Sequence, residues 1–124
     1  MPVSLRPRTV DVVDETFVRA RPATVRAALD EPGLLDRLWP GLQREVLQDR
    51  GTKGVRWRAG GDVEGRLEIW LEEASGGTIV HHFLHGRQRR GGRRWVEQHR
   101  RRWKGGLHVI KDHLEGRRPR GGGL

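Results

Sequence analysis

Residues 16–41 constrain the fold more than any other segment, because they combine the end of a strand with two short helices that directly follow one another. Pro22 suits the first turn of the first helix, where a missing N–H breaks no hydrogen bond. Val25, Ala28 and Leu29 then fall on one helical face. A strand followed at once by two abutting helices is an unusual order of elements.

The second short helix is expected directly after the first. Asp30 or Glu31 is predicted to cap its N-terminus, with Pro32 in its first turn. Residues 39–41, Trp-Pro-Gly, end it. Its apolar side is supplied by Leu34, Leu35 and Leu38.

Alternating apolar residues predict a first strand over residues 10–19 and four more strands after the helices. In the first strand Val13 and Phe17 share one face, and the other face holds Val10, Val12, Thr16 and Val18. The later strands are expected at residues 42–49, 55–59, 64–73 and 78–85. Their connections are too short for parallel crossovers, so these four strands are predicted to form an antiparallel meander.

The last two strands form a predicted hairpin whose register has two alternatives. Leu67, Ile69 and Leu71 share one face of the first hairpin strand, and Trp70 lies on the other. A loop of two or four residues places His82 on the leucine face, together with Val80 and Leu84. A loop of three residues reverses this choice, because a slip of one residue moves every side chain to the opposite face.

A long amphipathic helix is predicted over residues 93–115. At 100° per residue nearly all of its apolar residues fall within an arc of roughly 120°, together with His99, Gly106 and His113. The sheet is the only apolar partner available to this face. The pair Gly105 and Gly106 costs about 2 kcal/mol of helix propensity, so we expect Gly106 to allow a close approach to the sheet or to a ligand.

The length of 124 residues favours one domain, predicted at residues 9–115 between a tail at 1–8 and a disordered basic tail at 116–124. The net charge of +9 arises in the last third, where residues 87–124 hold 13 Lys and Arg against 3 Asp and Glu. The chain contains no cysteine, which excludes disulfides and thiolate chemistry. No apolar run could span a membrane, and no signal peptide is evident, so a cytoplasmic location is expected.

These elements resemble the START-like (SRPBCC, helix-grip) superfamily, in particular bacterial polyketide cyclase/dehydrase-type proteins. The similarity rests on residues 20–25 (Ala-Arg-Pro-Ala-Thr-Val), on residues 39–41, on the strand at 67–72 with the turn at 76–78, and on the closing helix. It implies an α+β fold of about five antiparallel strands gripped by the long helix. It also implies an apolar ligand between sheet and helix. The family usually has six or seven strands, so the cavity is expected to be smaller or to be completed by a partner chain.

The predicted function is therefore binding of a hydrophobic or aromatic small molecule of polyketide or lipid type, with cyclase/dehydrase-like activity as an open extension. Six residues are the candidates for lining the cavity between sheet and helix. Trp residues offer large apolar surfaces, and a histidine in a cleft is suited to proton transfer near neutral pH. The six candidates are Trp57, Trp70, His82, His99, Trp103 and Gly106.

No metal site, cofactor or set of catalytic residues is predicted. His81 and His85 would lie roughly 13 Å apart along a strand, and His99 and His113 about 21 Å apart along a helix. The sequence contains no nucleophile elbow and no phosphate-binding loop.

An alternative function is electrostatic binding of nucleic acid or another anionic surface by the arginine-rich closing helix. No helix-turn-helix, zinc finger or RNA-binding aromatic motif accompanies the arginines. A homodimer is a third hypothesis, suggested by the narrow sheet. The residues assigned to the electrostatic alternative are Arg94, Arg100, Arg101, Arg102 and Lys104.

Overall fold

The computed structural model describes residues 8–116. Of the predicted tails at 1–8 and 116–124, only Arg8 and Gly116 lie among the described residues, and Arg8 already belongs to a strand. The elements in chain order are β1 (Arg8–Val18), α1 (Pro22–Leu29), α2 (Leu34–Leu38), β2 (Leu42–Asp49), the 3₁₀ turn η1 (Gly51–Lys53), β3 (Gly54–Gly61), β4 (Val63–Ala74), β5 (Gly77–Gln88) and α3 (Trp95–Leu114).

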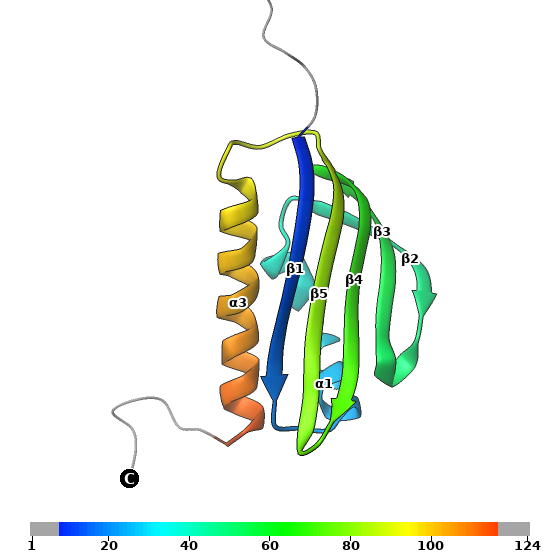
Figure 1. Cartoon of the computed structure of the whole chain (residues 1–124), viewed down its shortest axis with the longest axis vertical. Coiled ribbons are helices and arrows are strands. Elements are labelled where there is room, and N and C mark those ends of the chain that lie inside the picture. Colours follow the sequence, from blue (N-terminus) through cyan, green and yellow to red (C-terminus); the bar gives the residue numbers. More distant parts are fainter. Residues whose placement is uncertain (1–7, 117–124) are drawn as a thin grey trace, which may run out of the picture.

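The five strands form one antiparallel sheet in the order β1-β5-β4-β3-β2. Figure 1 shows the sheet from its outer face, with α1 behind it and α3 running alongside β1. The predicted α+β helix-grip architecture and the predicted meander of the last four strands are confirmed. In the described part of the chain, the helices cover one face of the sheet, which we call the inner face. We call the opposite face the outer face.

The loop between β4 and β5 settles the register that the sequence left open. Ala74 pairs with Gly77, so the loop contains two residues, and Gly76 adopts a left-handed φ of 81° that such tight turns require. Leu67 then pairs with Leu84, and Ile69 pairs with His82. His82 therefore lies on the inner face with the leucines, as the two-residue alternative predicts.

The start of α2 differs from the prediction. The helix begins at Leu34, and its N-cap is Gly33 with φ of 79°; no side chain caps it. The chain leaves α1 through a turn in which the Glu31 N–H donates to the Ala28 carbonyl, so neither Asp30 nor Glu31 is placed to cap α2. Because Gly33 reaches a left-handed conformation freely, it redirects the chain where a capping side chain was expected.

Strand β5 is longer than predicted and continues to Gln88. Gln88 pairs with Arg8 of β1 on one side and with Val63 of β4 on the other. The three residues after the predicted end of this strand therefore belong to the sheet, since two neighbouring strands hold this end of β5 by backbone hydrogen bonds.

The core lies between the inner face of the sheet and the buried stripe of α3. The stripe consists of Trp95, His99, Trp103, Leu107 and Ile110, as the helical periodicity predicts. Lys104 fixes the helix to β1 through an ion pair of 2.9 Å with Asp14 and a hydrogen bond to Thr16 Oγ1. Lys111 donates to the Phe17 carbonyl at 2.6 Å. These two lysines set the position of α3 along the edge strand.

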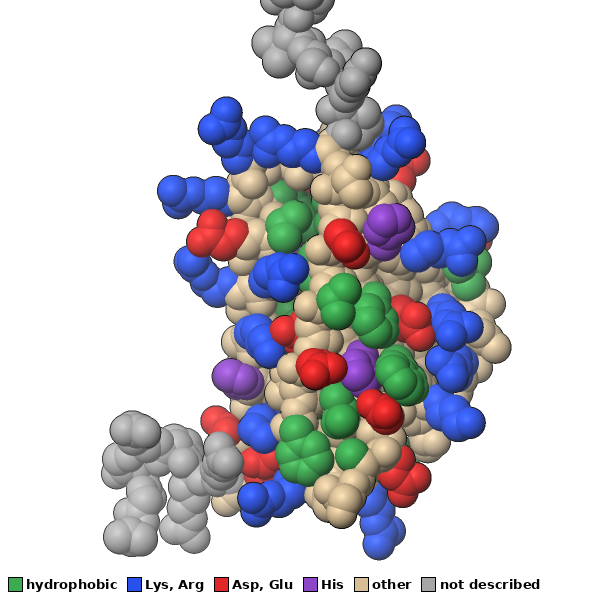
Figure 2. All heavy atoms as spheres, viewed as in Figure 1, with side chains coloured by type: hydrophobic (Ala, Val, Ile, Leu, Met, Phe, Trp, Pro, Cys, Tyr) green, Lys and Arg blue, Asp and Glu red, His purple; other side chains and the backbone are tan. Residues whose placement is uncertain are grey.

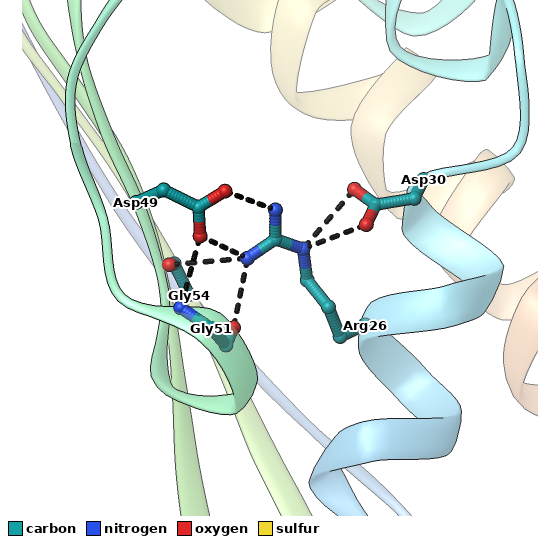
Figure 3. A network of polar contacts seen from close by, with 5 residues as sticks. All are labelled: Arg26, Asp30, Asp49, Gly51 and Gly54. Carbon is teal, nitrogen blue, oxygen red and sulfur yellow. Dashed lines mark hydrogen bonds and ion pairs between the residues drawn. The ribbon is translucent and has the colours of Figure 1, made fainter.

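Arg26 ties α1 to the turn between β2 and β3 (Figure 3). Its guanidinium contacts Asp49 at 2.8 Å and Asp30 at 2.9 Å, and it donates to the carbonyls of Gly51 and Gly54. The hydrogen bonds from Arg26, with one from the Gly51 N–H, lower the pKa of Asp49 to about 2. One side chain thereby joins α1 to the β2–β3 turn, about 25 residues further along the chain.

Replacing Arg26 tests this junction. We expect Arg26→Leu to lower the free energy of unfolding by about 1–3 kcal/mol, because it removes the hydrogen bonds by which one side chain links Asp30 of the α1 end to Asp49 and the β2–β3 turn. The control is Arg58→Leu, which removes a single exposed ion pair with Glu45 and should cost less than about 1 kcal/mol. Urea unfolding at pH 7 measures both. Equal losses for the two variants would contradict the assigned role of Arg26.

Candidate ligand-binding compartment

Trp39 and the four ring side chains in contact with it meet between the sheet and α3, and all five are buried. We call this cluster the aromatic compartment. Its members come from four parts of the chain, because β3 and β5 supply one ring each, α3 supplies two, and the residue after α2 supplies the fifth. The five are Trp57, His82, His99, Trp103 and Trp39.

A hydrogen bond between two histidines lies at the centre of the compartment. His82 Nε2 and His99 Nε2 are 2.8 Å apart, and His82 Nδ1 is 3.3 Å from the Glu68 carbonyl oxygen. A carbonyl only accepts, so His82 Nδ1 donates, and His82 Nε2 in the neutral ring accepts from His99 Nε2. This assignment leaves His99 Nδ1 as an acceptor, and no partner for it is found within residues 8–116.

Both histidines are neutral at physiological pH. Burial lowers the pKa of His82 to about 4, and burial followed by the nearby His82 lowers the pKa of His99 to about 3. The exposed guanidinium of Arg100 pushes both pKa values in the same direction. A charged ring at either position would be a buried cation without a carboxylate, which low-dielectric surroundings disfavour.

The indole of Trp39 fills the middle of the compartment. Its ring is stacked on His82 at 5.1 Å and on Trp103 at 5.5 Å, and it meets Trp57 edge to face at 5.7 Å. The Arg44 guanidinium lies over the Trp39 and Trp57 rings at about 6 Å. The indole nitrogens of Trp39 and Trp103 are buried, and the described residues offer neither of them an acceptor.

Four of the six predicted lining residues meet in this compartment: Trp57, His82, His99 and Trp103. Trp70 does not. It lies on the outer face, stacked on His81 at 4.3 Å. Because side chains alternate along a strand, the register that turns His82 inward turns Trp70 outward, and the prediction that both line one cavity is corrected.

Gly106 permits a close approach between helices. A Cβ at this position would lie 2.4 Å from Leu38 Cδ2, so α2 packs directly against α3. Sequence reasoning expected the sheet or a ligand there and missed α2. It also missed Trp39, because residues 39–41 were interpreted only as the end of the second short helix. The size and hydrophobicity of Trp39 were the signals that could have indicated a buried side chain.

An open groove lies outside the compartment, between α1, α2 and α3. Its volume is about 840 Å³, and apolar side chains dominate its lining. Val109 contributes a side chain that is 70% exposed. The lining includes Ala27 and Ala28 of α1, Leu34 of α2, and Gly106, Val109 and Ile110 of α3.

The predicted electrostatic residues do not gather on one face. Lys104 is bound to Asp14, and Arg101 pairs with Glu97 at 3.1 Å. Arg94, Arg100 and Arg102 are exposed, and none of them forms an ion pair in the described part of the chain. Since consecutive helical residues are turned by about 100°, Arg100 and Arg102 point to different sides of α3.

Solved structures with this arrangement confirm the fold. An Aha1 dimer from Colwellia psychrerythraea superposes with a TM-score of 0.64 at 18% identity, over 86% of this chain and 96% of that one. A protein from Mesorhizobium loti gives 0.65 at 18%, over 89% and 100%. The AHSA1-like protein from Rhizobium etli gives 0.64 at 20%, over 97% and 90%. The chain has the START-like, helix-grip fold. By sequence, no family model and no curated protein matches this chain.

Two properties of residues 8–116 bear on their chemistry. No helix within residues 8–116 is long and apolar enough to cross a membrane. The same residues contain no group of three or more His, Cys, Asp or Glu arranged to hold a metal ion.

The histidine pair makes stability depend on pH. The unfolded chain binds protons at these rings below about pH 6.5, while the folded chain does not until pH falls to about 4. We therefore expect the free energy of unfolding to fall as pH decreases from 6.5 to 4, by up to about 1.4 kcal/mol per pH unit for each histidine.

Urea unfolding between pH 4 and 8 measures this dependence. His99→Gln should reduce the slope to about half, whereas His108→Asn, an exposed position on the same helix, should leave it unchanged. A wild-type stability that stays constant from pH 7 to 5 would contradict the assignment of a neutral pair.

Proposed function

We propose that this START-like domain binds a small hydrophobic or aromatic molecule, which docks in the groove between α1, α2 and α3. The groove is the observation that carries the proposal. Its volume of about 840 Å³ lies in the range of small-molecule sites, which are typically lined by apolar groups with a few polar ones. The polar groups here are Thr24, Glu31, Arg37 and His113.

The aromatic compartment supports the same class of ligand. Trp57, His82, His99 and Trp103 surround the indole of Trp39, so the interior already accommodates a fused aromatic ring. Gly106 lines the groove and lies on the same helix, less than one turn beyond Trp103. The groove and the compartment are therefore neighbours along α3, and a ligand of polyketide or lipid type suits both.

We do not extend the proposal to cyclase or dehydrase catalysis. A general acid or base works best when its pKa is close to the operating pH. Burial holds the pKa of His82 near 4 and that of His99 near 3, so both rings are weak bases at neutral pH. A binding role requires no proton transfer and fits a neutral pair.

Filling the groove tests the proposal. Ala27 is exposed and lines the groove, whereas Ala23 is exposed on the same helix and is not part of the lining. We expect Ala27→Phe to weaken binding at least about tenfold, which is roughly 1.4 kcal/mol, and Ala23→Phe to leave it unchanged.

Binding is followed by amide chemical shifts, using a panel of fused-ring aromatic phenols and medium-chain fatty acids. Saturable shifts at groove residues in wild type and Ala23→Phe, but not in Ala27→Phe, support the proposal. Binding that is equal in all three proteins, or absent for the whole panel, overturns it.

Binding of an anionic polymer is a second candidate, favoured by the exposed and unpaired Arg94, Arg100 and Arg102 among the described residues. Counterion release predicts that affinity for duplex DNA falls steeply with salt. Changing Arg100, Arg101 and Arg102 to glutamine should then reduce the salt slope by about two to three. An unchanged slope excludes this surface.

Self-association remains a hypothesis for this chain. The Colwellia relative is a dimer, and the outer sheet face here exposes Val13 and Phe17. Figure 2 shows hydrophobic side chains gathered at the middle of that face, with Lys and Arg side chains along its borders. Light scattering at several protein concentrations distinguishes monomer from dimer.

A further inference from the structure

Trp39 enters the compartment from a different kind of segment than the other four rings. Trp57 and His82 belong to strands, and His99 and Trp103 belong to α3, whereas Trp39 follows α2, a helix of five residues with none buried. Its indole nevertheless is only 1% exposed and touches four other rings. The centre of the compartment is thus filled by a side chain that follows a short helix whose three leucines are only partly buried.

No hydrogen bond from the indole nitrogen anchors Trp39 there. The Nε1–H of Trp95 donates to Asp62 at 2.9 Å, but the Nε1–H of Trp39 is buried without an acceptor among the described residues. Burying such a donor without an acceptor is unfavourable relative to leaving it in water. Ring stacking therefore holds Trp39 in place against a polar penalty.

The segment around Trp39 is bounded by two backbone positions suited to a hinge. Gly33 has a φ of 79° before α2. Pro40 and Gly41 follow Trp39, and Gly41 is fixed because its carbonyl accepts from the Asp62 N–H at 2.9 Å. Between these points the backbone N–H groups of Leu34, Arg37 and Trp39 donate to carbonyls at most four residues back. Two bonds tie residues 34–39 to β2, from the Leu42 N–H to the Trp39 carbonyl at 3.1 Å and from Arg44 to Asp36 at 3.0 Å. Movement of the segment as a unit breaks these two bonds but no hydrogen bond between strands.

The groove lies on the other side of this segment. Leu34 and Arg37 of α2 line it together with Gly106 of α3. Leu38 of α2 packs on Gly106 of α3, so the two helices are in direct contact between the groove and Trp39. Movement of α2 away from α3 would therefore connect the groove with the space that Trp39 occupies.

From these observations we propose that Trp39 is a displaceable internal occupant of the compartment, and that a planar aromatic ligand takes the place of its indole when α2 moves away from Gly106. This inference rests on the proposed function and specifies how the ligand enters. The structure described here is then the closed form, in which the chain's own aromatic ring covers the binding surface.

The polar atoms that remain define the class of ligand. With Trp39 displaced, the compartment retains the Trp103 Nε1–H as a donor and His99 Nδ1 as an acceptor, both unpartnered within residues 8–116. A ligand that satisfies them has a carbonyl oxygen and a hydroxyl group on a fused ring system. The ligand carries no positive charge, because burial disfavours a cation on either histidine and the Arg44 guanidinium already lies over the Trp39 ring.

A reversible disulfide between α2 and α3 tests the movement of α2 without any ligand. The chain has no cysteine, and a Cβ at position 106 would lie 3.2 Å from Leu38 Cγ, which suits a disulfide. In Leu38→Cys/Gly106→Cys, we expect oxidation to slow hydrogen exchange at Trp39 Nε1 at least about tenfold, equivalent to roughly 1.4 kcal/mol. Exchange at Trp95 Nε1 is the internal reference and should not change.

The matched control is Leu38→Cys/Gly105→Cys, because a Cβ at Gly105 meets nothing within 4 Å and points away from Leu38. Oxidant should leave its exchange at Trp39 unaltered. If the oxidised and reduced forms of the 38/106 variant exchange Trp39 Nε1 at the same rate, the inference is overturned.

Binding of 6-acetyl-2-naphthol, which has a ketone and a hydroxyl at opposite ends of a fused ring, provides the second measurement. We expect the reduced 38/106 variant to bind it like wild type, and the oxidised form to bind at least about tenfold more weakly. Trp39→Ala should bind more tightly than wild type. Binding that is equal in all forms overturns displacement but leaves the proposed function intact. Binding in none of them overturns the inferred ligand class, and the panel of phenols and fatty acids then decides whether the proposed function also fails.

Discussion

The hydrogen bond between His82 and His99 is the interaction on which the interior depends. It joins the central part of β5 to α3 at 2.8 Å, in a place where most proteins of this size have only apolar contacts. Its direction is fixed by the Glu68 carbonyl, and its neutrality is fixed by burial. Both the hairpin register and the rotation of α3 must be correct for the two rings to meet, so this bond reports on the whole sheet-to-helix interface.

The consequence for function is that the space expected to be a cavity is filled by the protein itself. Trp39 stacks on His82 and Trp103. The open groove lies outside the aromatic compartment, between the three helices. The sheet has five strands. The proposed ligand site therefore combines an outer groove with an inner compartment that one indole fills.

The sequence predicted the order of elements and the buried stripe of α3, because hydrophobic periodicity is a local property. It also identified His82, His99, Trp57 and Trp103 as neighbours. It could not choose the register of the β4–β5 loop, which decided whether His82 or His81 lies on the leucine face, since one residue of loop length moves every side chain of the strand to the other face. Leu38 opposite Gly106 and Trp39 among the rings are contacts between distant segments, and no local pattern encodes them.

The most direct test of this account is the ¹⁵N NMR spectrum of the imidazole rings at pH 7. One neutral ring should be protonated at Nδ1 and accept at Nε2, as assigned to His82, and the other should be protonated at Nε2, as assigned to His99. Both patterns should persist unchanged from pH 8 to 5, with a scalar coupling across the Nε2–H···Nε2 bond. If either ring takes up a proton near pH 6.5, the two rings are not the buried neutral pair that the structure shows.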